Sequence, residues 1–326
     1  MRNIINICRN FLWTGDAHRG SSALVAWKIV CMPKAKGGLG LFDLCARNKR
    51  FFAKQLWHIH LKTDSVWIRW IHHFYLSNGT VWNVHAHHTS FPLWKAIISI
   101  RDLIFQHYGD SEVESISLIS SWSNSVGPFL AHAYDFFRPV GSAVSWSRVV
   151  WEQWSLTKYS FILWLAVMGK LRTRDRLPFI LTNPTCSFYR CEEETHGHLF
   201  FACSWTVCLW DKIKSWLRIG KRMSTLNSAI HGLHSKRFNM EFRMKRVSLA
   251  ITIYLIWEER NKRVFEAKAR GVDTIFRRFQ ILFYIVLHFH EKDHLQMVVG
   301  WSSWIDGCSS HLDVLTIEVV AMVGSL

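Results

Sequence analysis

The sequence predicts a mainly α protein: a helical assembly with a small loop rich in cysteine and histidine between helices, and a short β or turn segment near the N-terminus. Three observations support this fold class. Apolar residues recur at intervals of three and four through much of the chain, which is the spacing of a buried helix face. Hydrophobic residues make up 49% of the chain and charged residues 20%, so a substantial core can form. A glycine-rich run, 33–41, marks the expected turn.

Two helices are expected within residues 1–79. One begins at Asp43, where apolar residues follow at helical spacing. The second begins after Asp64, which we expect to cap it, and ends at Asn78-Gly79. The run PKAKGGLGL before them lacks the lysine-hydroxyl pair and the glycine spacing of phosphate-binding loops, so we interpret it as a turn.

The segment 80–145 is less patterned and is interpreted as linker-like. Its serine-rich run, 111–126, is expected to be an exposed connection. A cluster of histidines in this segment has no neighbouring thiol or carboxylate side chain, so a solvated loop is favoured over a metal site. This cluster consists of His85, His87 and His88.

The loop 185–210 concentrates candidate metal ligands. Thiolate sulfur and neutral imidazole are the donors that tetrahedral Zn²⁺ prefers in proteins. Apolar residues at 199–201 are expected to anchor the loop to a core. The candidate zinc ligands are Cys186, Cys191, His198 and Cys203.

The remaining cysteines are scattered, and the N-terminus has neither the long apolar stretch nor the cleavage site of a signal peptide. We therefore expect a nuclear or cytoplasmic protein rather than a secreted one, in which clustered Cys and His bind metal instead of forming disulfides. The most apolar run, 281–287, is far shorter than the ~20 residues that span a membrane. No membrane partner is expected.

The C-terminal third is expected to contain three helices. The first is capped by Ser204, the second covers 242–265, and the third is capped by Asp273 or Thr274. Acidic residues near the end of the second helix stand beside arginines and lysines, so salt pairing is their expected role. These acidic residues are Glu258, Glu259 and Glu266. Beyond residue 291 only a short strand at 314–320 is suggested.

Several blocks resemble plant non-LTR (LINE-type) retrotransposon polyproteins. FLWTG, LVAWKIVCMPKAKGGLGL and NKRFFAKQLW, in this order, resemble the region after the polymerase core. The run from Trp146 to Trp216, with SFILWLA, LRTRDRL and HLFF around the Cys/His loop, is similar to the reverse-transcriptase zinc-binding domain. IWEERN with Phe265 resembles the I-W-x-x-R-N…F signature that closes these elements.

The resemblance implies that the loop holds Zn²⁺. One position departs from the family pattern, because Tyr189 occupies the place of the second cysteine. Cys191, two residues later, would have to replace it with C-x4-C spacing. The resemblance also divides the chain into a post-polymerase connection region, a linker-like segment, the zinc-binding domain, a C-terminal helical region and an unassigned tail, at 1–79, 80–145, 146–220, 221–290 and 291–326.

The charge of the chain favours a polyanionic partner. The formal net charge is +16 and the sequence pI is about 9.7, which points to RNA or DNA. Phe188 and Trp205 are candidate stacking residues. A basic stretch before the loop could contact phosphates, although a solvated helix face is an equally supported interpretation. This stretch contains Lys170, Arg172, Arg174 and Arg176.

The sequence lacks the clustered carboxylates that polymerases and ribonucleases H use to hold catalytic metals, and it contains no Asp-Asp pair. We therefore expect a non-catalytic zinc- and nucleic-acid-binding tail of a reverse transcriptase that holds template RNA or target DNA. Such a tail could also complement a reverse transcriptase in trans. The alternative is a decayed or domesticated fragment with a structural or protein-interaction role and no nucleic-acid binding.

Overall fold

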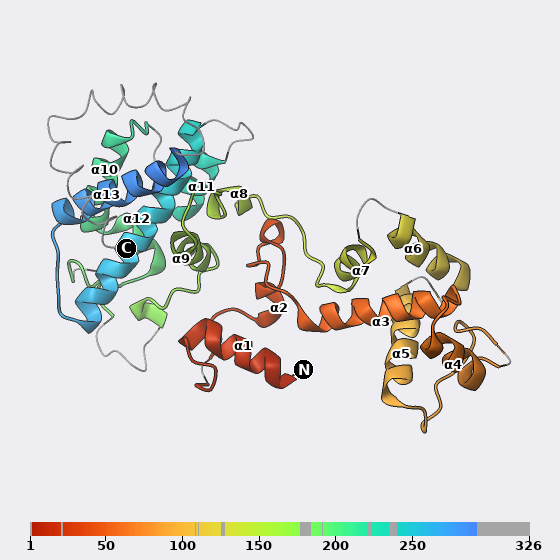
Figure 1. Ribbon diagram of the computed structural model, residues 1–326. Helices are drawn as coiled ribbons and strands as arrows, with labels where there is room; N and C mark the ends of the chain where they lie inside the picture. Colours follow the sequence, from red (N-terminus) through yellow and green to blue (C-terminus); the bar gives the residue numbers. More distant parts are fainter. Residues whose placement is uncertain are drawn as a thin grey trace. The chain divides into compact units, whose positions relative to one another are not determined.

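The mainly α prediction is confirmed by a computed structural model of the chain (Figure 1). Within the residues that the structure describes, all named elements are helical, and the only β pairing is a single antiparallel bridge between Thr185 and Glu193. The described residues are 2–20, 22–77, 79–107, 109, 111–124, 128–176, 184–190, 192–220, 223–234 and 240–291. The strand suggested at 314–320 lies outside them.

The chain divides into two compact units, residues 1–143 and residues 144–326. In the first unit α3 is central, because it packs against α4, α5 and α7. Its core includes Ile59, Ile71, Trp94 and Ile104, whose side chains are fully buried. The helices of this unit are α1 (Arg2–Thr14), α2 (Trp27–Val30), α3 (Leu44–His60), α4 (Val66–Tyr75), α5 (Pro92–His107), α6 (Glu112–Asn124) and α7 (Phe129–Phe137).

The N-terminal ends of α3 and α4 are capped by side chains. Asp43 accepts hydrogen bonds from the backbone N–H groups of Cys45 and Ala46, as expected. The cap of α4 is Ser65, whose hydroxyl accepts a hydrogen bond from Ile68 N–H. Asp64, the predicted cap, lies one residue too early and faces Arg69 at 3.5 Å instead.

The glycine-rich run forms a turn, as predicted, but the short β segment proposed near it is not present in the described residues. A single 3₁₀ turn, Lys34–Lys36, is followed by Gly37 with φ of 91°. At Gly38 a Cβ would lie 2.0 Å from the carbonyl oxygen of Met32. Only glycine fits at such a distance, so the close approach of the backbone explains why position 38 of this turn is glycine.

The segment 80–145 is not the linker that the sequence suggested. It contains α5, α6 and α7, and the serine-rich run forms α6 rather than an exposed connection. Ile119 and Trp122 of α6 are buried in the core of the first unit. Serine content misled the prediction because the few apolar side chains of α6 suffice to fix it against the core.

The second unit is organised around α12, the longest helix. It packs against α9 and α13, and its middle is buried on nearly all sides. The helices of this unit are α8 (Ser147–Val150), α9 (Thr157–Val167), α10 (Ser204–Trp216), α11 (Leu226–Leu233), α12 (Met240–Phe265) and α13 (Val272–Glu291), with a 3₁₀ turn at Arg174–Arg176 and a π-helical turn at His198–Ala202. Among the described residues, no helix is long and apolar enough to cross a membrane.

Candidate metal centre

Three of the four predicted ligands converge in the second unit. Ligand atoms of Cys186, His198 and Cys203 all lie within 4.8 Å of one another, and both cysteines are buried. The two sulfur atoms are 3.8 Å apart. Two thiolates bound tetrahedrally to one zinc at about 2.3 Å would have their sulfurs about 3.8 Å apart. This spacing therefore fits Zn²⁺ and is far longer than a disulfide bond.

A short paired loop presents Cys186. The backbone N–H of Cys186 donates to the carbonyl of Glu192 at 2.7 Å, and Arg190 N–H donates back to the carbonyl of Cys186 at 2.9 Å. Thr185 and Glu193 form the antiparallel bridge beside them. Arg190 adopts φ of 55°, which lets the chain reverse within this small loop.

The π-helical turn presents the other two ligands. Cys203 N–H donates to the carbonyl of His198 at 2.8 Å, five residues earlier, which brings both ends of the H-x4-C spacing to the same place. Thr195 caps this turn by accepting a hydrogen bond from His198 N–H. Residues 199–201 are buried, which confirms that they anchor the loop to the core.

The two thiols form a coupled pair in which one loses its proton readily. The hydrogen bond shared by the two thiols lowers the pKa of Cys186 well below its usual value, and the backbone N–H groups of Phe188 and Tyr189 lower it further against the effect of burial. The same hydrogen bond and burial raise the pKa of Cys203. A cation between the sulfurs would take the place of the shared proton.

His198 is oriented by a carboxylate. Its Nδ1 lies at the ion-pair distance of 2.8 Å from Oε2 of Glu192, and both ring nitrogens are buried without a hydrogen-bond partner among the described residues. A carboxylate on one ring nitrogen favours the proton there and leaves the other nitrogen available as a ligand. The sequence did not assign this position to Glu192, the first residue of the acidic run 192–194 between the ligands.

Two further predictions concern the fourth ligand. Cys191 lies outside the residues that the structure describes. Tyr189, at the family's cysteine position, is 55% exposed and does not belong to the cluster. His196, the second histidine of the loop, packs against the ring of Phe200, and burial lowers its pKa to about 4.

Helix α12 braces the ligand loop through two arginines. Arg260 donates to Oε1 of Glu194 through Nε at 2.9 Å and Nη2 at 2.7 Å, and both side chains are buried. The other oxygen of Glu194 accepts a hydrogen bond from Ser187 N–H. Arg263 donates to the carbonyl of Phe188 at 3.3 Å. The sequence did not reveal this brace, because its partners are 66 and 75 residues apart.

The candidate stacking residues are engaged with each other. Phe188 and Trp205 stack with ring centroids 4.4 Å apart and an interplanar angle of 10°, and both are buried. The guanidinium of Arg263 lies over both rings. Their role in this structure is to pack the loop against α10 and α12.

The basic stretch begins where α9 ends. Gly169, with φ of 59°, ends the helix and directs Lys170 outward. Lys170, Arg172 and Arg176 are exposed, and Arg176 also donates a hydrogen bond to the carbonyl of Gly169. Arg174 is different: its Nε lies 3.9 Å from Glu194, and its backbone N–H donates to the same carboxylate.

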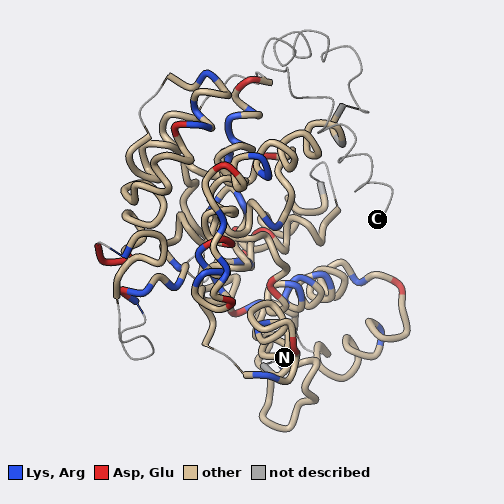
Figure 2. Tube along the Cα trace, turned by 90° about the vertical axis from the view of Figure 1, so that its left-hand side faces the viewer, with Lys and Arg blue, Asp and Glu red and all other residues tan. Residues whose placement is uncertain are grey.

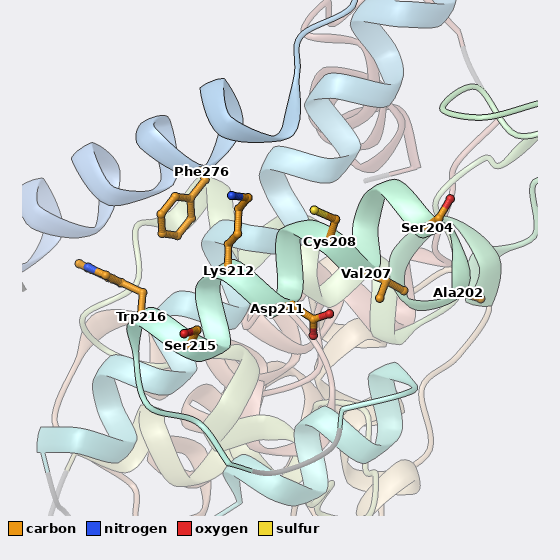
Figure 3. Close-up of a pocket in the computed structure, with 9 residues that line it drawn as sticks. All are labelled: Ala202, Ser204, Val207, Cys208, Asp211, Lys212, Ser215, Trp216 and Phe276. Carbon is orange, nitrogen blue, oxygen red and sulfur yellow. The ribbon is translucent and has the colours of Figure 1, made fainter.

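A shallow hollow of about 930 Å³ lies between α10 and α13. Figure 3 shows that Trp216 and Phe276 flank it and that Lys212 points into it. Its charged groups are paired, Lys212 with Asp273 at 2.9 Å and Asp211 with Lys214 at 2.8 Å. Paired surface charges of this kind give the hollow no evident acid or base for catalysis.

Comparison with known proteins finds a similarity in the region around the candidate metal centre. A family described as zinc-binding in reverse transcriptase matches residues 129–210. An Arabidopsis thaliana protein named as a ribonuclease H protein is 31% identical over 67 residues, which are 21% of this chain and 11% of the Arabidopsis protein. The chain thus matches a small part of that relative's length. No solved structure matches the chain. The region 129–210, which holds the three converging ligands, is therefore similar to the zinc-binding region of reverse transcriptases.

Proposed function

We propose that this protein is a zinc-dependent, non-catalytic tail of a retrotransposon reverse transcriptase that holds template RNA or target DNA. The observation that carries the metal part is the 3.8 Å separation of the Cys186 and Cys203 sulfurs beside His198. Cys191 would complete the four-ligand set. Four protein ligands leave no open position for water, so the zinc would stabilise the fold rather than hydrolyse a substrate.

Charge and exposure support the nucleic-acid part of the proposal. The chain carries 40 lysines and arginines against 24 acidic residues. Lys170, Arg172 and Arg176 are exposed after α9, and Arg174 in the same stretch contacts Glu194 of the ligand loop. Arg174 would serve mainly to hold Glu194, and the other three would contact phosphates.

Zinc content tests the metal part. The purified full chain is expected to retain one zinc per molecule by mass spectrometry, and Cys203→Ser is expected to lose it. Cys208→Ser is the matched control, because Cys208 lies on α10 five residues away but is exposed and outside the cluster. A wild-type chain that folds without metal would overturn the zinc proposal.

Salt dependence tests the nucleic-acid part. Binding to labelled RNA and DNA should weaken steeply as salt rises, and Lys170→Gln with Arg172→Gln should make that dependence shallower. An absence of binding at low salt would overturn this part while leaving the zinc result intact.

A second candidate, a decayed fragment that binds neither metal nor nucleic acid, is favoured by one observation. Tyr189 occupies the family's cysteine position and is exposed. Zinc affinity of Tyr189→Cys compared with the wild type discriminates the two. A large gain would show that the natural site is incomplete, and equal affinity would show that Cys191 already completes it. A primer-extension assay with a reverse transcriptase, with and without this chain, tests whether it acts in trans.

A further inference from the structure

Helix α3 of the first unit carries positive charge that the fold does not neutralise. It contains four lysines and arginines and no carboxylate, and none of the four lies within ion-pair distance of a carboxylate in the described part of the chain. Figure 2 colours Lys and Arg blue and Asp and Glu red along the Cα trace. The four cations are Arg47, Lys49, Arg50 and Lys54.

Cations in the second unit behave differently. There most arginines of α12 and α13, and the one between them, bind glutamates, and Arg278 contacts both carboxylate oxygens of Glu258. These paired arginines are Arg246, Arg260, Arg263, Arg270 and Arg278. The N–H donors that an arginine directs at a glutamate are not available to an outside anion. The α3 helix therefore offers a cationic surface that those helices do not.

Exposed aromatic rings alternate with these cations. Arg47, Phe51 and Lys54 stand at i, i+4 and i+7, so a ring lies between two cations on one face of the helix. Phe51 is 43% exposed, and Phe42, just before the helix, is 60% exposed. We call Phe42, Arg47, Arg50, Phe51 and Lys54 the α3 surface.

The arginines of the α3 surface are held in place by rings rather than by acids. The Arg47 guanidinium carbon lies 5.6 Å from the centroid of Phe42, and that of Arg50 lies 5.0 Å from Phe51 and 5.6 Å from Tyr134. A guanidinium over a ring can keep its N–H edge available for an anion, and this applies to the exposed Arg47, whereas the Nε of Arg50 is buried. The helix also turns its other side, with Ala53 and Leu56, into the core, so the α3 surface faces outward.

We propose that the α3 surface binds single-stranded nucleic acid, with Arg47 and Lys54 on successive parts of the phosphate backbone and a base stacked on Phe51. Seven helical residues place the two cations about 10 Å apart along the axis. Phosphates and unpaired bases alternate along a single strand, which matches the alternation of cation and ring. In a duplex the faces of the bases are stacked inside the helix, and an acidic peptide has no bases. Neither ligand would therefore stack on Phe51.

The test measures binding of the full chain to fluorescein-labelled oligo(dT) and oligo(U) over a range of salt concentrations. Arg47→Gln with Lys54→Gln should make the slope of log affinity against log salt shallower by about 1.4, because each phosphate contact on a single strand contributes about 0.7. Phe51→Leu should weaken binding about 5-fold or more at unchanged slope, since one lost base stack costs at least about 1 kcal/mol.

The matched control removes two paired, exposed cations. Arg69→Gln with Lys268→Gln changes the net charge equally, because Arg69 faces Asp64 and Lys268 faces Glu266. The proposal predicts that this control keeps the wild-type slope. Circular dichroism should show the wild-type helix content in all variants.

Three outcomes would overturn the inference: an α3 double variant no weaker than the control, equal binding of the wild type to polyglutamate, or unchanged affinity of Phe51→Leu. The Lys170→Gln and Arg172→Gln variant separates this site from the proposed one beside the metal centre. Loss confined to that variant would support the phosphate contacts proposed beside the metal centre and overturn the α3 surface. Loss confined to the α3 variants would support the α3 surface and overturn the contacts proposed for Lys170 and Arg172.

Discussion

Arg260 and Glu194 form a buried ion pair 2.7 Å long between helix α12 and the candidate zinc loop. Glu194 is fully buried, and Arg260 is 2% exposed. The arginine belongs to the I-W-x-x-R-N signature, and the glutamate to the acidic run between the ligands. The pair joins two sequence features that had no evident connection.

Breaking this pair should destabilise the second unit. Replacing Arg260 by Met leaves Glu194 buried without its hydrogen-bonded arginine, with only Arg174 remaining at 3.9 Å, and the expected loss is about 3 to 5 kcal/mol. Urea unfolding measures it. Lys268→Gln removes the partner of Glu266 at the surface and should change stability by about 0 to 1 kcal/mol. An Arg260→Met loss no larger than this control would contradict the structural role of the pair.

The orientation of His198 by Glu192 can be tested within the acidic run itself. Glu192→Gln replaces the carboxylate beside Nδ1 with a neutral amide. Zinc affinity measured by chelator competition should therefore fall about tenfold, the lower end of the range for residues that hold a metal ligand in place. Glu193→Gln is the neighbouring control, with the same loss of charge on an exposed side chain. Equal affinities of the two variants would show that Glu192 does not position the ligand.

Stability of the second unit should fall in acid partly through Glu258. Burial alone would raise the pKa of this carboxyl, but hydrogen bonds from Arg278 and Arg270 outweigh it and hold the pKa below the usual 4.5. The unfolded chain therefore takes up the proton first. The contribution is complete above pH 4.5 and is lost as the pH falls through the lower, folded pKa.

Urea unfolding from neutral pH to well below 4.5 measures this dependence. Glu258→Gln cannot titrate, so its stability should decline less steeply over the acidic range than that of the wild type. Parallel curves for the two proteins would show that the Glu258 ion pairs do not contribute to acid unfolding.

The turn before α3 should not tolerate a side chain at Gly38. A Cβ there would lie 2.0 Å from Met32 O and 2.4 Å from Ile29 O, and both are backbone atoms that cannot move aside freely. Gly38→Ala should therefore destabilise the first unit by about 1 to 3 kcal/mol, as overpacking does. Gly20→Ala is the control, since nothing lies within 4 Å of its added Cβ. If the Gly38→Ala and Gly20→Ala variants had the same thermal unfolding temperature, the close approach at Gly38 would be contradicted.

The sequence by itself determined the helices and the chemistry of the metal loop. Helical spacing located α3 and α12 because a buried stripe repeats in the sequence as it does in space. Cys186, His198 and Cys203 were identifiable because thiol and imidazole donors lie close together in the chain. The linker expected at 80–145 was wrong because the packing of α6 depends on residues of other helices, which local composition does not report.

Only the tertiary structure decided how the loop is held. Arg260 and Arg263 reach Glu194 and Phe188 across 66 and 75 residues, and Phe188 and Trp205 stack on each other rather than remain open to a base. The three neighbouring glutamates have different surroundings: Glu192 beside His198, Glu193 exposed and Glu194 buried. Such differences arise from which side chains fold against each residue, and a run of identical letters carries no information about them.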